Sequence, residues 1–374
     1  MLRVAHVSTF PNMRCGIATY ASDLIASMPS VKHFRYALHY GQDNSEGTAA
    51  GANNSSPNEL RELALRISRS DCDVVSLQHE FGIWGGENGE HIFQFLEVIS
   101  KPLVSTLHTT FPPRSRPDIQ VSILRKVVEQ SQKVMVLTDA SRRSLAALLS
   151  RDYPNVVTIP HGLPAVPSAS VGALPEFSDR ACRLGSVGFF RRDKGIETIL
   201  VALWKLKERG YKVTYAIAGE AQRQFAGQTD YQGEVDQLTR RLNLQDRVES
   251  IDRYLSVEEQ IDFIQHCHAG IFAYQTPEQS SSGTVPLVFA CGRPVICTPF
   301  EYAVAKQAEG MDVTLAINFG ADALADSITN FLARQSLPQI CEDVHRRAQQ
   351  WIWPVVGARY QTEFEKAVKG TVSP

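Results

Sequence analysis

Residues 279–298 read QSSSGTVPLVFACGRPVICT, and this segment is the clearest indication of the fold in the chain. Small and polar side chains come first, over 280–284, and an apolar run then continues to Cys291 and Gly292. Because glycine commonly closes a helix, we expect a loop that enters a helix ending near Gly292. The residues that follow, 294–297, are apolar and predict a short buried strand.

A helix that starts after small residues can bind a phosphate, because its first backbone N–H groups lack partners and carry the positive end of the helix dipole. A second loop of this kind, residues 8–16 (STFPNMRCG), follows an apolar strand and precedes another predicted helix. It contains neither the GxGxxG pattern nor the lysine of a P-loop, which argues against a dinucleotide oxidoreductase and against an NTPase. Two such loops in the two halves of the chain predict a ligand held between two domains.

The composition argues against several classes of protein. The 374 residues carry 38 basic and 40 acidic side chains, and a net charge of -2 gives no reason to expect nucleic-acid binding. The seven cysteines are scattered without a C-x-x-C pair, as in a reducing compartment. The start lacks the apolar core of a signal peptide, and the sequence contains no apolar run of membrane-spanning length. We therefore expect a cytoplasmic protein.

One region carries a local charge surplus. Residues 101–151 contain nine Lys or Arg and three acidic residues. Solvated helix faces explain such a surplus, and so does a patch that contacts anionic lipid or an anionic acceptor. Peripheral contact with the inner face of the membrane is therefore the alternative to a purely cytoplasmic location.

Both halves alternate short apolar runs with amphipathic segments, which predicts parallel sheets with helices on both faces. The segment 164–179 is rich in Pro and small residues, so we expect one Rossmann-like domain over 1–165 and a second over 180–352. A Trp-Ile-Trp-Pro sequence at 351–354 interrupts the last helical pattern, and a helix over about 354–370 is expected to pack back on the first domain. Residues 41–57 are rich in Gly, Asn and Ser and predict a loop without a part in the core.

Ligands bind beyond the carboxyl ends of the strands in doubly wound sheets, so polar residues after predicted strands are the candidates. Residues 78–86 (QHEFGIWGG) follow one such strand. There His79, Glu80 and Trp84 suit a carbohydrate, since Trp stacks on sugar faces while His and Glu bind hydroxyls; a structural turn is the alternative. The segment lacks HExxH, and the His-Cys-His sequence at 266–268 lacks a fourth ligand, so no metal site is expected.

Two further strand ends carry candidate residues. His108 directly follows a predicted buried strand and is either a satisfied structural histidine or a functional one. Residues 188–195 (GFFRRDKG) bring three cations to a strand end before a helix. A diphosphate leaving group needs such cations, because its charge grows as the bond breaks; an exposed basic turn is the alternative.

Together these segments resemble the family 4 retaining glycosyltransferases of the GT-B fold and, within that family, a mannosyltransferase-like branch. The matching segments run in the family's order over nearly the whole chain: GIATY at 16–20, QHEFGIWGG at 78–86, LHT at 107–109, IPHG at 159–162, GFFRRDKG at 188–195, SSGT at 281–284 and GRPVI at 292–296. The fold that this resemblance implies is α/β, with two doubly wound Rossmann-like domains facing each other across a cleft.

The resemblance also implies a function, the retaining transfer of a hexose such as mannose to a glycan or lipid-linked acceptor. The second domain would bind the nucleotide-sugar donor, GDP-mannose or a UDP-sugar, and the first domain the acceptor, with no metal or other cofactor required. His108 would contact the donor sugar at the reacting centre, Gly16 would let the backbone approach the diphosphate, and Arg191 with Lys194 would stabilise the leaving group. The residues expected to hold the donor at the helix start are Gln279, Ser281, Ser282, Gly283 and Thr284.

The chain departs from the family in two places. The family usually has two glutamates separated by seven residues, and the corresponding positions here are Gln279 and Leu287. It also often has an arginine directly after the glycine equivalent to Gly188, where this chain has phenylalanine, so that Arg191 or Arg192 must replace it. The missing glutamates favour a second hypothesis, a non-catalytic GT-B protein that binds a sugar or nucleotide. A third is a nucleotide-sugar epimerase, which acts on the donor without an acceptor.

Overall fold

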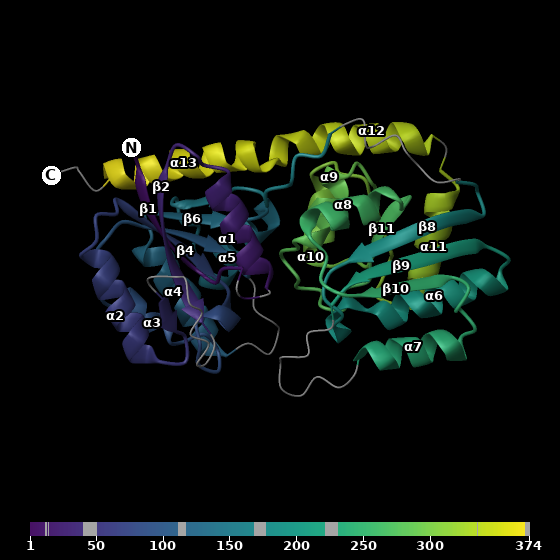
Figure 1. Cartoon of the computed structure of the whole chain (residues 1–374), viewed down its shortest axis with the longest axis horizontal. Helices are drawn as coiled ribbons and strands as arrows, with labels where there is room; N and C mark the ends of the chain where they lie inside the picture. The colour runs from purple at the N-terminus through teal and green to yellow at the C-terminus, as the bar shows by residue number, and fades with distance from the viewer. Residues whose placement is uncertain are drawn as a thin grey trace. The chain divides into compact units, whose positions relative to one another are not determined.

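The computed structural model describes residues 1–11, 13, 15–39, 51–110, 117–167, 177–220, 231–334 and 336–370. Contacts within the chain divide it into two compact units (Figure 1). The first unit consists of Met1–Gly162 and Trp353–Pro374, and the second of Leu163–Ile352.

The first unit is built on a seven-stranded parallel sheet in the order β3-β2-β1-β4-β5-β6-β7. Its central strands β1, β4 and β5 are buried almost throughout, as expected for a parallel sheet covered on both faces, although they carry polar residues toward their carboxyl ends. The strands are β1 (Arg3–Ser8), β2 (Lys32–His39), β3 (Gly51–Asn53), β4 (Val74–His79), β5 (Leu103–Leu107), β6 (Lys133–Val136) and β7 (Val156–Thr158).

Helices cover both faces of this sheet because successive residues of a strand point to opposite sides. Val74 joins a core with residues of α1 and α13, whereas Val75 joins the core formed with α2, α3, α4 and α5. Helix α13 lies against α1 so closely that a Cβ on Gly357 would be 2.2 Å from the Ser27 hydroxyl oxygen. The helices of this unit are α1 (Gly16–Ala26), α2 (Pro57–Ser68), α3 (Ile92–Leu96), α4 (Asp118–Gln130), α5 (Asp139–Leu149) and α13 (Trp353–Gly370), with a 3-10 turn η1 (Phe81–Ile83).

The loop predicted over 41–57 requires a correction. Residues 40–50 lie outside the described part of the chain, but Gly51–Asn53 forms strand β3, which pairs with β2. Ala52 and Asn54 are both buried. Glycine and asparagine have weak intrinsic strand preference, so pairing with β2 sets this conformation rather than local sequence.

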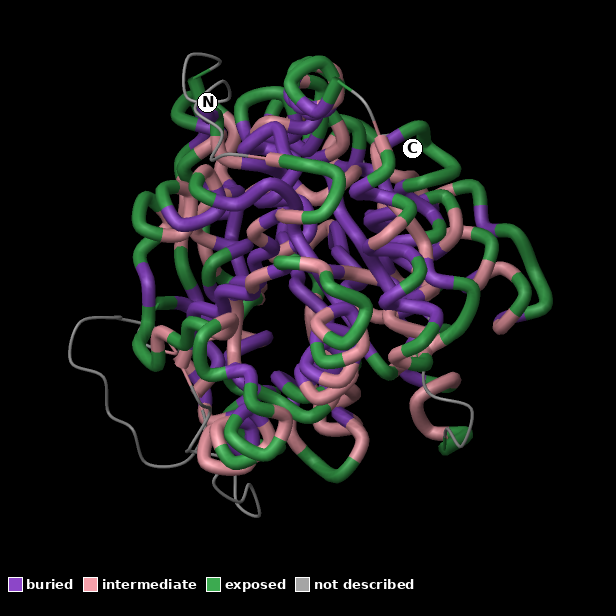
Figure 2. Tube along the Cα trace, turned by 90° about the vertical axis from the view of Figure 1, so that its right-hand side faces the viewer, coloured by how far each residue is buried: buried purple, intermediate pink, exposed green. Residues whose placement is uncertain are grey.

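The second unit repeats the plan with a six-stranded parallel sheet in the order β10-β9-β8-β11-β12-β13. In Figure 2 the buried residues lie mainly on inner stretches of the trace, and the exposed residues lie mainly on its outer loops. The strands are β8 (Ala181–Val187), β9 (Lys212–Gly219), β10 (Val248–Asp252), β11 (Ala269–Phe272), β12 (Val295–Cys297) and β13 (Val313–Leu315). The helices are α6 (Ile196–Glu208), α7 (Tyr231–Arg241), α8 (Val257–Gln265), α9 (Thr284–Ala290), α10 (Glu301–Ala308), α11 (Ala321–Leu332) and α12 (Leu337–Ala348), with 3-10 turns η3 (Arg192–Lys194) and η4 (Gln349–Trp351).

The two strand orders locate the positions where ligands are expected. In the first sheet the chain builds outward from β1 through β2 and β3 and then returns to place β4 on the other side of β1. In the second sheet β8 and β11 form the same kind of switch point. Ligands of doubly wound sheets bind at the carboxyl ends of the strands next to such a switch, and the candidate residues follow β4, β5, β8 and β11.

Candidate functional site

His108 follows β5 in the first unit and is 5% exposed. Its Nε2 lies 2.8 Å from Oε1 of Gln78, which is on the neighbouring strand β4. Burial lowers the pKa of His108 to about 3, so the ring is neutral near neutral pH. A neutral imidazole can exchange hydrogen bonds with a sugar hydroxyl without introducing a charge.

Two tyrosines that the sequence did not single out support His108. The Tyr20 ring from α1 meets the His108 ring edge-on, with centroids 4.8 Å apart. The Tyr20 hydroxyl lies 2.8 Å from that of Tyr360 on α13, which in turn lies 3.0 Å from the Thr106 hydroxyl oxygen on β5. The C-terminal helix is thereby joined to the strand that carries His108.

Several buried polar atoms at this sheet edge have no hydrogen-bond partner among the residues that the structure describes. Both ring nitrogens of His79 are without one, although the side chain is fully buried against Phe81. Burial lowers the pKa of His79 to about 3. The other unpartnered atoms at the ends of β1, β4 and just beyond β5 are Ser8 Oγ, Gln78 Nε2 and Thr110 Oγ1. An unpaired buried polar group costs about 1–3 kcal/mol, so this cluster is typical of a site that a hydroxyl-bearing ligand completes.

Glu80 and Trp84 serve the turn after β4. The partly buried Glu80 carboxylate accepts hydrogen bonds from the Phe81 backbone N–H at 3.1 Å and from the Thr109 hydroxyl at 2.6 Å, and burial raises its pKa. Trp84 is fully buried, packs on Phe95, and donates from Nε1 to the main-chain oxygen of Gln78 at 3.1 Å. Because neither face of the Trp84 ring is accessible, the predicted stacking on a sugar does not fit this structure.

Gly16 is the first residue of α1 and is exposed. A Cβ built on Gly16 would meet no atom within 4 Å, so the space beside this backbone is open. The preceding Cys15 caps the helix, its sulfur accepting from the Ala18 backbone N–H at 3.4 Å. The candidate loop also includes Asn12 and Arg14, which lie outside the described residues.

In the second unit, the end of β8 meets the start of α9. Gly188 has a φ of +128°, and a Cβ there would lie 3.2 Å from Cγ2 of Thr284. Turn η3 packs even more closely on the end of β11, because a Cβ on Gly195 would lie 1.9 Å from the Ala273 carbonyl oxygen. Lys194, the last residue of η3, places its Nζ 3.9 Å from the centroid of the Tyr274 ring.

The structure distinguishes the two arginines of this turn. Arg192 pairs with Glu234 at 2.5 Å and lies over the ring of Tyr231, so it is turned toward α7. The Nε of Arg191 lies 2.8 Å from Asp193, whose other carboxylate oxygen is 3.6 Å from Lys194 Nζ. Arg191 and Lys194 therefore share one carboxylate, and Arg191 is the better candidate for the role of the family's arginine.

The predicted donor loop folds on itself. Gln279 donates from Nε2 to the main-chain oxygen of Ser281 at 2.7 Å, and the Ser282 hydroxyl accepts from the Val285 N–H at 3.2 Å. The Thr284 hydroxyl lies 3.3 Å from that of Ser282 and 2.9 Å from that of Tyr274. Gly283 is exposed and gives α9 no side-chain cap.

Leu287, at one position of the family's glutamate pair, is 7% exposed. Its side chain belongs to the apolar core of the second unit. Gln279, at the other position, uses its amide within the loop. Neither position therefore presents a carboxylate.

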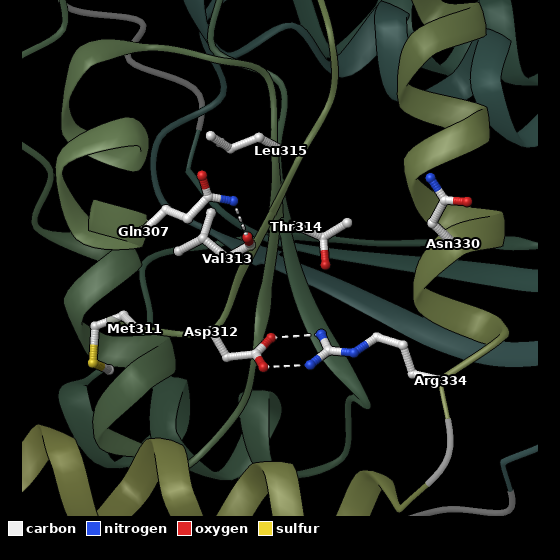
Figure 3. A pocket seen from close by; sticks show the side chains of 8 residues that line it. All are labelled: Gln307, Met311, Asp312, Val313, Thr314, Leu315, Asn330 and Arg334. Atoms are coloured by element: carbon white, nitrogen blue, oxygen red, sulfur yellow. Dashed lines mark hydrogen bonds and ion pairs between the residues drawn. The ribbon is translucent and has the colours of Figure 1, made fainter. Parts of the chain in front are cut away.

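Among the described residues, no group of three or more His, Cys, Asp or Glu side chains could hold a metal ion. A cavity of about 440 Å³ lies beside β13, between α10 and α11 (Figure 3). There Arg334 forms a two-bonded ion pair with Asp312, and Gln307 bonds the main-chain oxygen of Val313. None of the candidate residues lines this cavity.

Residues 177–351 match the family model of glycosyl transferases group 1. No curated protein matches the chain by sequence.

Solved structures share the fold over nearly the whole chain. Anabaena Alr3699/HepE in complex with UDP and glucose is 15% identical, with a TM-score of 0.73 over 98% of this chain and 100% of that chain. Sucrose-phosphate synthase from Thermosynechococcus elongatus is 15% identical, with a TM-score of 0.76 over 99% and 100%. A glycosyltransferase from Rickettsia africae is 14% identical, with a TM-score of 0.73 over 98% and 99%. The chain therefore has the GT-B fold, and residues 177–351, within its second unit, match the group 1 glycosyl transferases.

Proposed function

We propose that the chain is a retaining glycosyltransferase that moves a hexose from a nucleotide-sugar donor to a glycan or lipid-linked acceptor. The observation that carries this proposal is the cationic turn at the β8/β11 switch point. There Arg191 and Lys194 both contact the Asp193 carboxylate, within the segment that matches the group 1 family. A nucleoside diphosphate is the ligand whose charge such a turn neutralises.

In the proposed reaction, the bond from the sugar's anomeric carbon to the diphosphate breaks and a bond to the acceptor hydroxyl forms on the same face. The departing phosphate oxygen takes the acceptor's proton, so no protein carboxylate is needed as a nucleophile. Arg191 and Lys194 stabilise the growing negative charge of the diphosphate. Neutral His108 and the unpartnered groups around His79 bind hydroxyls of the sugar or acceptor.

A UDP-sugar is the first donor to test, because the related HepE structure contains UDP and glucose. GDP-mannose is the second, in line with the mannosyltransferase-like motifs. No additional cofactor is proposed. The second unit would bind the donor nucleotide, and the first unit the acceptor.

The test measures the melting temperature of the full chain with UDP, GDP, ADP and dTDP. A ligand at 100 times its dissociation constant stabilises a protein by about 2.7 kcal/mol. We expect one nucleotide to stabilise the wild type and Lys194→Ala to lose that effect while keeping its melting temperature without ligand. Stabilisation by none of the four would contradict the proposal.

An assay of product formation distinguishes a glycosyltransferase from a non-catalytic binding protein and from an epimerase. Transfer from the donor to a glycan or lipid-linked acceptor, lost in His108→Ala, is the expected result. Binding without any product would favour the non-catalytic protein that the absent glutamates suggest. Donor isomerised or hydrolysed without an acceptor would favour the epimerase.

We further propose a cytoplasmic location with peripheral contact at the inner face of the membrane. Among the described residues, no helix is long and apolar enough to cross a membrane. Arg125 and Arg143, on α4 and α5, are exposed cations, whereas Arg142 pairs with Asp152. Sedimentation with vesicles containing anionic lipid, compared with neutral vesicles, tests this contact, and loss of binding in Arg125→Ala/Arg143→Ala is expected.

A further inference from the structure

We propose that Tyr274 is a positioning residue that holds Lys194 and Thr284 in place for the diphosphate of the donor. This inference rests on the proposed function for the ligand, but its geometry stands by itself. Tyr274 follows β11 and is 4% exposed. Neither the family resemblance nor the strand-end motifs assigned it a role.

The ring of Tyr274 holds Lys194. The Lys194 Nζ is 3.9 Å from the ring centroid, which is short for a cation over an aromatic face. The Tyr274 ring also stacks on Phe300, with centroids 4.8 Å apart and planes 29° apart. Because a buried phenylalanine supports the ring and Asp193 lies 3.6 Å from Nζ, the ammonium is restrained at a defined point. A lysine on a free four-carbon chain would otherwise sample many rotamers.

The hydroxyl of Tyr274 holds Thr284. The two hydroxyl oxygens are 2.9 Å apart, and the Thr284 hydroxyl also lies 3.3 Å from that of Ser282. Thr284 opens α9, and its methyl group faces Gly188 at the end of β8. The Tyr274 side chain thus contacts Lys194 of η3 through its ring and Thr284 of α9 through its hydroxyl. Each of these two contacts can be removed separately.

The first experiment requires no ligand. Reductive methylation followed by mass spectrometry measures the reactivity of Lys194 in the full chain, with Lys205 as the internal reference. We expect Tyr274→Leu to raise the labelling rate of Lys194 at least several-fold and Tyr274→Phe, which keeps the ring, to leave it unchanged. Tyr231→Phe is the matched control, because Tyr231 also bonds a neighbour through its hydroxyl and lies under a cation, which there is Arg192 rather than Lys194. Unchanged labelling of Lys194 in Tyr274→Leu overturns the inference.

The second experiment measures the dissociation constants of UDP and GDP. For the nucleotide that binds, Tyr274→Phe is expected to weaken binding about fivefold, the effect of one hydrogen bond, and Tyr274→Leu about tenfold or more. If the hydroxyl acts through Thr284, Tyr274→Phe should weaken nucleotide binding little further in a Thr284→Val background. Additive losses of affinity would show that the hydroxyl does not act through Thr284. If the ring acts through Lys194, Tyr274→Leu should weaken nucleotide binding in a Lys194→Ala background no more than Tyr274→Phe does in that same background.

Failure of the inference is distinguishable from failure of the proposed function. If Lys194→Ala binds nucleotide as well as the wild type does, the leaving-group role of Lys194 is wrong, whatever Tyr274 does. If Lys194→Ala weakens binding but Tyr274→Leu does not, Tyr274 is not a positioning residue. Melting temperatures without ligand identify any variant that fails to fold, and Tyr274→Phe then carries the test because it preserves the stacked ring.

Discussion

Replacing Gly195 by alanine should destabilise the chain and displace Lys194. Gly195 has a φ of +65°, and a Cβ there would lie 1.9 Å from the Ala273 carbonyl oxygen, far inside van der Waals contact. The left-handed conformation costs alanine about 1–2 kcal/mol. Relief of the clash requires turn η3 to move away from β11, which adds about 1–3 kcal/mol as in other overpacked sites. The expected loss in the free energy of unfolding is therefore about 2–5 kcal/mol.

Gly210 provides the matched control. It also has a positive φ, +81°, but the nearest atom to an added Cβ is 3.9 Å away, at the end of the Arg180 side chain. Gly210→Ala should therefore lose only the conformational part, about 1–2 kcal/mol. Urea unfolding of both variants measures the difference, and a UDP or GDP titration measures the site. Equal destabilisation of the two variants, or full nucleotide affinity in Gly195→Ala, would refute the reasoning.

Three further predictions concern the first unit. Gly16→Ala should change the free energy of unfolding by less than about 0.5 kcal/mol, because an added methyl meets open space. If the diphosphate approaches this backbone, the same methyl should reduce the transfer rate. Unfolding and transfer assays on one preparation check both effects. Trp84→Phe should destabilise the chain by about 1–3 kcal/mol, because it removes the buried hydrogen bond from Trp84 Nε1 to the main-chain oxygen of Gln78. It should not change the dissociation constant of the nucleotide. Full stability with weakened sugar binding would restore the sugar-stacking role. His79 and His108 have folded pKa values of about 3 against about 6.5 unfolded, so the unfolded state binds more protons below pH 6.5. The stability present above pH 6.5 should therefore fall as the pH drops toward 3, by up to about 1.4 kcal/mol per pH unit for each histidine. Urea unfolding between pH 7 and 5 should show a smaller loss of stability in His79→Gln than in the wild type.

The fold was predictable because its signals are local. Apolar runs alternate with amphipathic ones, which specifies parallel strands and their covering helices without knowledge of distant contacts. Strand ends were therefore located well enough to point to His108 and to the cations after β8. The choice between Arg191 and Arg192 was not local, since it depends on Glu234 of α7, more than forty residues away in sequence.

The parts that the sequence did not predict depend on contacts between distant segments. Tyr20 and Tyr360 meet across 340 residues of chain, and no pattern around either residue indicates the other. Trp84 lies in a Gly-rich loop typical of binding sites, but its Nε1 turns inward to a main-chain oxygen. Tyr274 stands two residues beyond a strand end, where strand-end reasoning could have found it, but the contact with Lys194 depends on how η3 packs.

The two switch points differ in charge, and this difference bears on the function. In the first unit burial keeps His79 and His108 unprotonated, the Glu80 carboxylate is bonded to Phe81 and Thr109, and the other unpartnered atoms among the described residues belong to Ser, Gln and Thr side chains. In the second unit the corresponding position carries Arg191 and Lys194. A neutral polar edge suits the hydroxyls of a sugar or acceptor, whereas a cationic edge suits a diphosphate. A hydroxyl-bearing ligand would find partners in the first set that a nucleoside diphosphate does not need, since buried polar groups stabilise the fold only when a ligand or water bonds them. The pairing of these two chemistries on one fold is therefore the strongest argument for transfer rather than for simple nucleotide binding.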